Sequence, residues 1–474
     1  LEAYGSSVNG MITSVNQLLT YLGLAEAGVG TATVVALYTP LALKQTEEVN
    51  SILSATRKFY NKSGMLFLAL TLVLIGVYPF FISGQLENSL VRWMILVLAG
   101  STLVDYFFLG KYRVLLTANQ EGYVVALIQA AGTIVNMVVS IFLIYIGAGV
   151  LFVKAVATGV YMLRLVLVKI YAKRKYPALD FYAEPNEGAL KQKNAALLHQ
   201  VVGIIVNNTD TTVLTICLGA KSLLEVSVYG IYMMVVNAVN QLMTSFSNGL
   251  TAGFGEVIAK NEEETLKKSY SSYEYMYFVI MFIVIACMGV LILPFVGVYT
   301  INLTDVQYVR PVLGILFTLI VFMQNVRIPG LTIICAAGHY KETRYQAILE
   351  AVINITVSLG LVWKFGMAGV LLGTVCSYGY RSFEIVFYTS RHLVKGCAKK
   401  SMFRILRNVF TVAILCTVGT YVIPQEITSF TTWFLYAIGM GLTSVFLVVV
   451  INYVVEPDEF MQLRHRVNDI IKKE

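Results

Sequence analysis

The chain alternates long apolar runs with short polar connectors along almost its whole length. Runs of about 20 apolar residues are long enough to cross the hydrocarbon core of a membrane as helices. Thirteen membrane spans are therefore predicted, at 7–43, 62–83, 91–110, 122–146, 149–170, 196–219, 226–257, 273–299, 311–337, 345–363, 367–390, 405–423 and 430–454. The first of these runs is long and punctuated by glycines. The pattern predicts an all-α polytopic membrane protein.

Composition supports this class. Hydrophobic residues make up 57% of the chain and charged residues 13%, whereas soluble domains carry about 25% charged residues. A water-soluble domain of this length would have too little polar surface to cover its core.

The basic residues gather in alternate connectors. The net charge is +8, and most of the 35 Lys and Arg residues fall in one set of connectors. That set comprises 44–62, 111–121, 169–195, 260–268, 341–344, 391–407 and the tail after 456. Because Lys and Arg accumulate in cytoplasmic loops, these connectors and the C-terminus are expected in the cytoplasm. The charge thus indicates topology, and no nucleic-acid partner is expected.

This topology also bears on the start of the chain. Thirteen spans and a cytoplasmic C-terminus place Leu1 outside the cell. One further span before Leu1 is therefore expected, giving fourteen in all.

A diverged internal repeat divides the chain. The segment "LLTANQEGYVVALIQAAGTIVNMVVS" (115–140) aligns with "IICAAGHYKETRYQAILEAVINITVS" (333–358), at an offset of about 218 residues. That offset covers an even number of spans, so both halves have the same orientation, as in transporters built from parallel repeats. The last two predicted spans fall outside the repeat.

Motifs for enzymatic or metal chemistry are missing from the sequence. No GxxxxGK[ST] phosphate-binding loop occurs, the six cysteines are isolated, and the four histidines form no HExxH pair. Neither a catalytic site, nor a metal site, nor a cofactor is expected.

Four basic residues lie inside the predicted spans, and they are the leading candidates for a binding site. They are Arg327, Arg381, Arg164 and Lys154. Ionisable groups at membrane depth usually face a bundle interior or a wet cavity, and uncompensated cations there would suit an anionic substrate. Two alternatives remain open: Arg381 could pair with Glu384 at i,i+3, and Lys154 or Arg164 could reach an interface.

Acidic residues also interrupt the spans. In "NNTDTT", Asp210 follows Asn207 and Asn208 within an otherwise apolar run, and Glu26 and Asp105 also lie inside spans. Such acids could carry a coupling H⁺ or Na⁺, or gate a cavity by pairing with arginine. A static hydrogen bond between helices is the alternative.

Several segments resemble one family of transporters. "YGSSVNGMITSVNQLLTYLGLAEAGVGTATVVALYTPLA", "LLTANQEGY" and "NNTDTTVLTICLGAKSLLEVSVYGIY" are similar to the Wzx-type polysaccharide-biosynthesis flippases of the MOP superfamily. This superfamily also includes MATE exporters and lipid II flippases. The resemblance implies fourteen helices, with two six-helix lobes forming a V and two extra C-terminal helices. The family's first helix has no counterpart after Leu1.

On this basis the chain divides into five parts. They are an N-terminal lobe at 1–175, a cytoplasmic linker at 176–195, a C-terminal lobe at 196–395, two further helices at 396–455 and a cytoplasmic tail at 456–474.

The resemblance also implies a function that is transport and not enzymatic. A polyprenyl-diphosphate-linked oligosaccharide would move from the cytoplasmic to the outer leaflet of the bacterial cytoplasmic membrane by alternating access, for capsule, O-antigen or exopolysaccharide assembly. Arg327 and Arg381, assisted by Arg164 and Lys154, would hold the diphosphate, and Asp210 would tune the cavity charge. Expected partners are membrane lipids, a polysaccharide polymerase, glycosyltransferases and a coupling H⁺ or Na⁺. The alternatives are a lipid II flippase, a MATE-like drug antiporter and a non-transporting scaffold.

Overall fold

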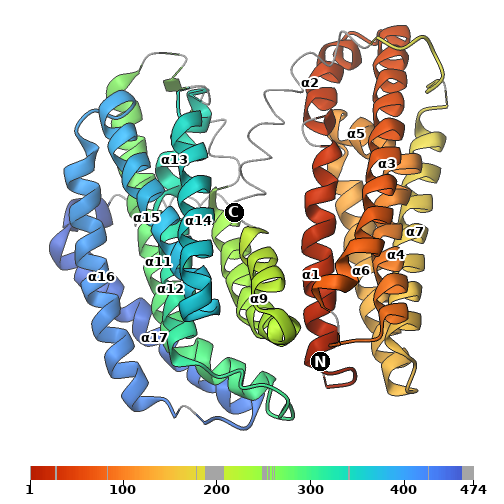
Figure 1. The fold of residues 1–474 in the computed structure, drawn as a ribbon. Helices are drawn as coiled ribbons and strands as arrows, with labels where there is room; N and C mark the ends of the chain where they lie inside the picture. Colours follow the sequence, from red (N-terminus) through yellow and green to blue (C-terminus); the bar gives the residue numbers. More distant parts are fainter. Residues whose placement is uncertain are drawn as a thin grey trace. The chain divides into compact units, whose positions relative to one another are not determined.

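The computed structural model describes residues 2–461 apart from gaps at 27–28, 83, 178, 187–207, 248–253, 255–256, 259, 261, 340–341 and 425. Every regular element in these ranges is helical, and they contain no β-strand (Figure 1). The predicted all-α class is confirmed.

Ten helices within the described ranges are long and apolar enough to cross a membrane. They are α3 (Thr46–Phe81), the run Asn88–Ala118, α6 (Gly122–Tyr145), α7 (Val150–Lys175), the run Gly219–Ser247 that contains α9 (Ser222–Ser247), α11 (Glu263–Tyr299), the run Pro311–Ala336, α14 (Arg344–Phe365), α16 (Cys397–Val422) and α17 (Phe430–Val455). The protein is therefore a multi-pass membrane protein.

The other three predicted spans differ from an uninterrupted apolar helix. The run at 7–43 is divided into α1 (Ser6–Leu22) and α2 (Val29–Ala42), with a 3₁₀ turn between them at Gly23–Glu26. The span at 196–219 is described from residue 208 and is helical over 208–217. The third, α15 (Met367–His392), is long enough, but charged residues interrupt its apolar character.

The chain forms two compact units, Leu1–Ser227 and Val228–Glu474. The sequence interpretation places the division earlier, at the linker 176–195. The difference arises because the segment after the linker packs on α1. Ser14 Oγ lies 2.8 Å from Thr215 Oγ1, and the Asn9 amide donates to Ser227 Oγ at 3.0 Å. A Cβ added at Gly10 would lie 1.8 Å from the Leu223 carbonyl oxygen, so only glycine permits this approach.

Within the second unit, α11 packs against α12 (Pro311–Val326), α16 and α17 (Figure 1). Helices α14 and α15 form a hairpin and pack against each other along their length. Gly369 and Gly373 of α15 form a GxxxG motif, which lets two membrane helices approach closely. A Cβ at Gly369 would lie 2.4 Å from the Leu361 carbonyl oxygen of α14.

Corresponding helices of the repeat are broken at corresponding positions. The run Asn88–Ala118 is interrupted by a π-helical turn at Asp105–Leu109 between α4 (Asn88–Val104) and α5 (Gly110–Ala118). The run Pro311–Ala336 breaks at Arg327, between α12 and α13 (Ile328–Ala336). The repeat offset places Leu109 opposite Arg327. Pro329 explains the second break, because proline is favoured at the start of a helix and disfavoured inside one.

Candidate functional site

Four ionisable side chains converge inside the second unit, and we call them the charge cluster: Arg327, Glu350, Arg381 and Glu384. Arg327 Nη1 pairs with Glu350 Oε1, and Arg381 Nη1 pairs with Glu384 Oε2. Glu350 Oε2 lies 3.6 Å from Arg381 Nε. Glu350 therefore stands between the two arginines and offers one carboxylate oxygen to each.

Helix packing brings these side chains together. Arg327 occupies the break between α12 and α13, Glu350 lies on α14, and both Arg381 and Glu384 lie on α15. The GxxxG contact of α15 with α14 sets the approach of these two helices. On the other side, a Cβ at Gly330 would lie 2.6 Å from Ile385 of α15, so α13 also approaches α15 closely.

Polar side chains around the cluster fix the helices further. The Asn354 amide of α14 donates to Thr374 Oγ1 of α15 at 3.0 Å. Ser382 Oγ donates to the Met323 carbonyl of α12 at 2.6 Å. The Arg327 guanidinium lies 4.5 Å from the centre of the Tyr378 ring, a favourable position for a cation. Each arginine is thus held in a defined place by neighbouring helices.

The charge cluster is buried and balanced. Its side chains are between 6% and 15% exposed, and two positive charges face two negative ones. Burying charges is costly unless they are paired and hydrogen-bonded, so the glutamates make these arginines tolerable at membrane depth. The local i,i+3 pairing of Arg381 with Glu384, left open by the sequence, is present. The bridging position of Glu350 is not visible in the sequence.

The other two candidate cations lie in the first unit, both on α7. Arg164 lines a small cavity with Asp105 and Arg113, and Arg113 Nη2 pairs with Asp105 Oδ2 at 3.1 Å. Among the described residues, Arg164 Nε has no hydrogen-bond partner. Lys154 is half-buried and lies about three turns before Arg164. The structure therefore gathers Asp105 with Arg164 and gathers Arg327 with Arg381.

The remaining acidic candidates also lie in the first unit. Asp210 is 4% exposed within the helical segment 208–217, and Asn208 Oδ1 accepts a hydrogen bond from the Gln17 amide of α1. Asn207 and the Glu26 side chain lie outside the described residues.

A second ionic network was missed by sequence reasoning. Arg404 falls within the basic segment 391–407, which was assigned to a connector, yet its side chain on α16 is 0% exposed. It pairs with Glu274 of α11 at 3.1 Å and with Glu456, beyond α17, at 3.0 Å. The partners are far apart in the sequence, so no local spacing indicates the network. It ties the two C-terminal helices to α11.

Comparison with known proteins identifies the fold. The described helices define a multi-pass membrane protein, and solved structures show which folds it resembles. No family model and no curated protein matches the chain. The inward closed conformation of the lipid II flippase MurJ is similar with a TM-score of 0.67 at 15% identity, covering 95% of this chain and 93% of that chain.

Multidrug transporters share the fold as well. An inward-facing conformation of a MATE family transporter of the MOP superfamily has a TM-score of 0.61 at 15% identity and covers 87% of this chain and 93% of its own. MATE in the bent conformation has a TM-score of 0.52 at 14% identity, with coverages of 87% and 95%. These likenesses show the fold.

Proposed function

We propose that the chain flips a polyprenyl-diphosphate-linked oligosaccharide across the bacterial cytoplasmic membrane by alternating access. The single observation that carries the proposal is the charge cluster, in which two buried arginines share Glu350. Arginine presents a planar fork of donors that matches phosphate oxygens bidentately. Arg327 and Arg381 would hold the diphosphate, with Arg164 and Lys154 assisting.

The pairing supplies a mechanism for loading and release. Without substrate, the glutamates neutralise both arginines at a depth where a free charge is costly. A diphosphate would compete with Glu350 and Glu384 for the same guanidinium groups. Charge balance would then require the released carboxylates to take up H⁺ or Na⁺, which links substrate binding to a coupling ion. Asp210 is a further candidate for such uptake.

The structural comparisons favour a lipid-linked substrate over a drug. The match to the lipid II flippase covers 95% of this chain with a TM-score of 0.67, whereas the match to the inward-facing MATE transporter covers 87% with a TM-score of 0.61. Lipid II is therefore the alternative substrate. The expected orientation, with the C-terminus and the basic connectors in the cytoplasm, makes the movement outward.

The test uses the full chain in proteoliposomes. A polyprenyl-diphosphate oligosaccharide is incorporated, and its accessibility to an external sugar-modifying enzyme is followed with and without H⁺ or Na⁺ gradients. We expect wild-type translocation to fall about tenfold or more in Arg327→Gln and Arg381→Gln. Arg92→Gln, which removes an exposed cation of α4, is the matched control and should retain activity.

Three outcomes would redirect the proposal. Absence of oligosaccharide movement together with efflux of organic cations would indicate a drug antiporter. Preferential transport of lipid II would indicate the alternative lipid substrate. Unchanged translocation by Arg327→Gln and Arg381→Gln would remove the charge cluster from the mechanism.

If Asp210→Asn leaves translocation unchanged at every pH and membrane potential, Asp210 has no coupling role.

A further inference from the structure

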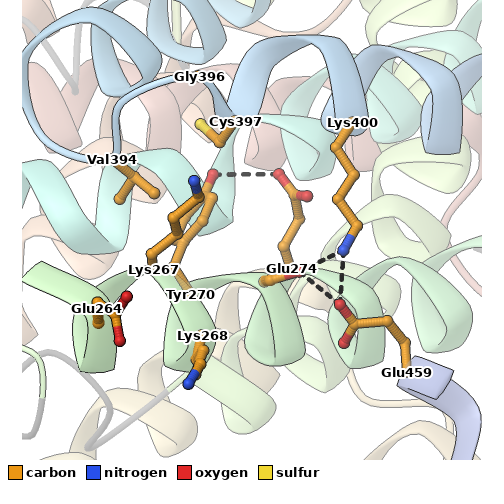
Figure 2. Close-up of a pocket in the computed structure, with 11 residues that line it drawn as sticks. Glu264, Lys267, Lys268, Tyr270, Glu274, Val394, Gly396, Cys397, Lys400 and Glu459 are labelled. Carbon is orange, nitrogen blue, oxygen red and sulfur yellow. Dashed lines mark hydrogen bonds and ion pairs between the residues drawn. The ribbon is translucent and has the colours of Figure 1, made fainter.

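A cavity of about 430 Å³ opens in the second unit at the end where α11 and α16 begin, away from the charge cluster. Figure 2 shows that its walls come from the first turns of α11, the turn between α15 and α16, the start of α16 and Glu459 beyond α17. This end carries the basic connectors of the unit.

The acidic residues of the inner wall already have partners. The Glu274 carboxylate accepts a hydrogen bond from Tyr270 at 3.1 Å (Figure 2). It also accepts one from Ser401 at 2.6 Å and forms an ion pair with Arg404. The Glu459 carboxylate pairs with Lys400 at 2.6 Å. Neither carboxylate is therefore an uncompensated charge that would repel an incoming anion.

Basic side chains predominate among the other charged residues that line the cavity. Lys267 and Lys268 of α11 line the cavity, are exposed, and make no hydrogen bond or ion pair with any other described residue. The Lys400 side chain is 47% exposed despite its pair with Glu459. Among the residues that line the cavity, one exposed carboxylate, that of Glu264, faces Lys267 and Lys268. The mouth of the cavity thus carries surplus positive charge.

The start of α16 adds to this surplus. The helix is 26 residues long and has no acidic residue in its first turn, where the Ala398 backbone N–H donates to Ser390 Oγ at 3.0 Å. Its first turn instead contains Lys399 and Lys400. The N-terminus of a helix favours negative charge. Lys400 has Glu459 beside it, whereas Lys399 makes no ion pair with any other described residue, so a further anion here would be favourable. Gly396 and Cys397 of this turn are part of the cavity wall.

We propose that this cavity binds a phosphate group, carried either by an anionic phospholipid headgroup or by a soluble phosphate ester, and that the bound phosphate links α11 to α16. Basic pockets between membrane helices at headgroup level suit anionic headgroups. Lysine ammonium groups act as point charges for phosphate, and the Arg404 network behind them keeps the site rigid. The site is separate from any transported substrate at the charge cluster.

The experiment measures thermal unfolding of the full chain in lipid nanodiscs of phosphatidylcholine with increasing fractions of phosphatidylglycerol. A parallel arm titrates glycerol 3-phosphate into phosphatidylcholine nanodiscs. The test variant is Lys267→Gln/Lys268→Gln, and the matched control is Lys173→Gln/Arg174→Gln, which removes two adjacent exposed cations from the last turn of α7 in the first unit. All four substituted residues are exposed, so folding should be retained.

We expect phosphatidylglycerol to raise the unfolding temperature of the wild type. The response should require about tenfold more anionic lipid in the test variant and stay unchanged in the control. Protection by glycerol 3-phosphate as well would indicate a soluble ester as a ligand, and protection by phosphatidylglycerol alone would indicate a lipid headgroup. An equal loss in both double variants would show general surface attraction and overturn the site, as would a wild type that does not respond.

Alkylation of Cys397 provides an independent measurement. This thiol lines the cavity, and its modification by a small maleimide can be followed by mass spectrometry. Phosphatidylglycerol should slow modification of Cys397 while leaving that of Cys217, a half-buried thiol at the end of the helical segment 208–217 in the first unit, unchanged. Equal rates at Cys397 with and without anionic lipid would contradict binding in this cavity.

Discussion

At the scale of single residues, buried charge is the most informative feature of this protein. Arg327 and Arg381 lie where an isolated cation would be costly, and each is held by a glutamate. Glu350 contacts both arginines, whereas Glu384 contacts Arg381 alone among the described ion pairs. The two glutamates therefore differ in what their loss would leave behind.

Glu350→Gln should lower the free energy of unfolding by about 3–5 kcal/mol, because it leaves two buried arginines with one carboxylate. Glu384→Gln should cost less, since its side chain is the more exposed of the two and Arg381 keeps Glu350. Denaturant unfolding of both variants in the same detergent measures the difference. A cost for Glu350→Gln equal to or below that of Glu384→Gln would contradict the bridging role.

The Glu459 carboxylate should make stability depend on pH. Burial raises the pKa of this carboxyl. Hydrogen bonds from Lys400 and Ser271, together with the charges of Lys400 and Arg404, lower the pKa by more, so in the folded protein it is below the ordinary value. Because the ordinary value is about 4.3, this stabilisation is complete above that pH and is lost as the pH falls through the folded value.

Thermal unfolding of the wild type and Glu459→Gln from pH 7 to pH 3.5 tests this expectation. The gap between the two proteins should be constant at neutral pH and shrink below about pH 4. A gap that stays the same over the whole range would show that folding does not lower the pKa of Glu459.

At the scale of helices, close approach through glycine sets the geometry of the charge cluster. A Cβ at Gly373 would lie 2.2 Å from Ser358 Oγ and 2.7 Å from the Ser358 backbone nitrogen. Ser358 is fully buried on α14, and its hydroxyl donates to the Val370 carbonyl of α15 at 3.1 Å. Any side chain at position 373 must therefore separate α14 from α15.

Gly373→Ala should lower the free energy of unfolding by about 1–3 kcal/mol and should also reduce translocation, because it shifts Arg381 away from Glu350. Gly379→Ala is the matched control on the same helix, since nothing lies within 4 Å of a Cβ there. The control should be neutral or slightly stabilising because alanine favours helix more than glycine does. Equal effects at the two positions would mean that close packing does not position the cluster.

At the scale of the whole molecule, the alternation of basic and non-basic connectors predicts which ends of the helices face the cytoplasm. Tyr182 follows α7 and Ile301 follows α11, and both side chains are exposed. The charge pattern assigns the first to the cytoplasmic side and the second to the outer side.

Single cysteines at these positions, in a chain with its native cysteines replaced, test the orientation. Ile301→Cys should react with a membrane-impermeant maleimide in intact cells. Tyr182→Cys should react only after permeabilisation. The opposite labelling pattern would reverse the orientation and, with it, the direction proposed for transport.

The sequence by itself determined the class of this protein. Its apolar runs are long enough to cross a membrane and carry too little charge to face water, and within lipid the backbone N–H and C=O groups of such runs are hydrogen-bonded as helices. It also indicated the Arg381–Glu384 pair, since residues three apart on a helix share a face. These features depend on local spacing or composition alone.

Only the tertiary structure decided that Glu350 serves two arginines and that Arg404 is buried among three glutamates. It also decided that residues 208–227 pack with α1 in the first unit. Each of these contacts joins helices that are far apart in the sequence, and sequence spacing does not indicate which distant helices lie next to each other. They form because glycine contacts, a proline-associated break and the pairing of buried charges act between helices.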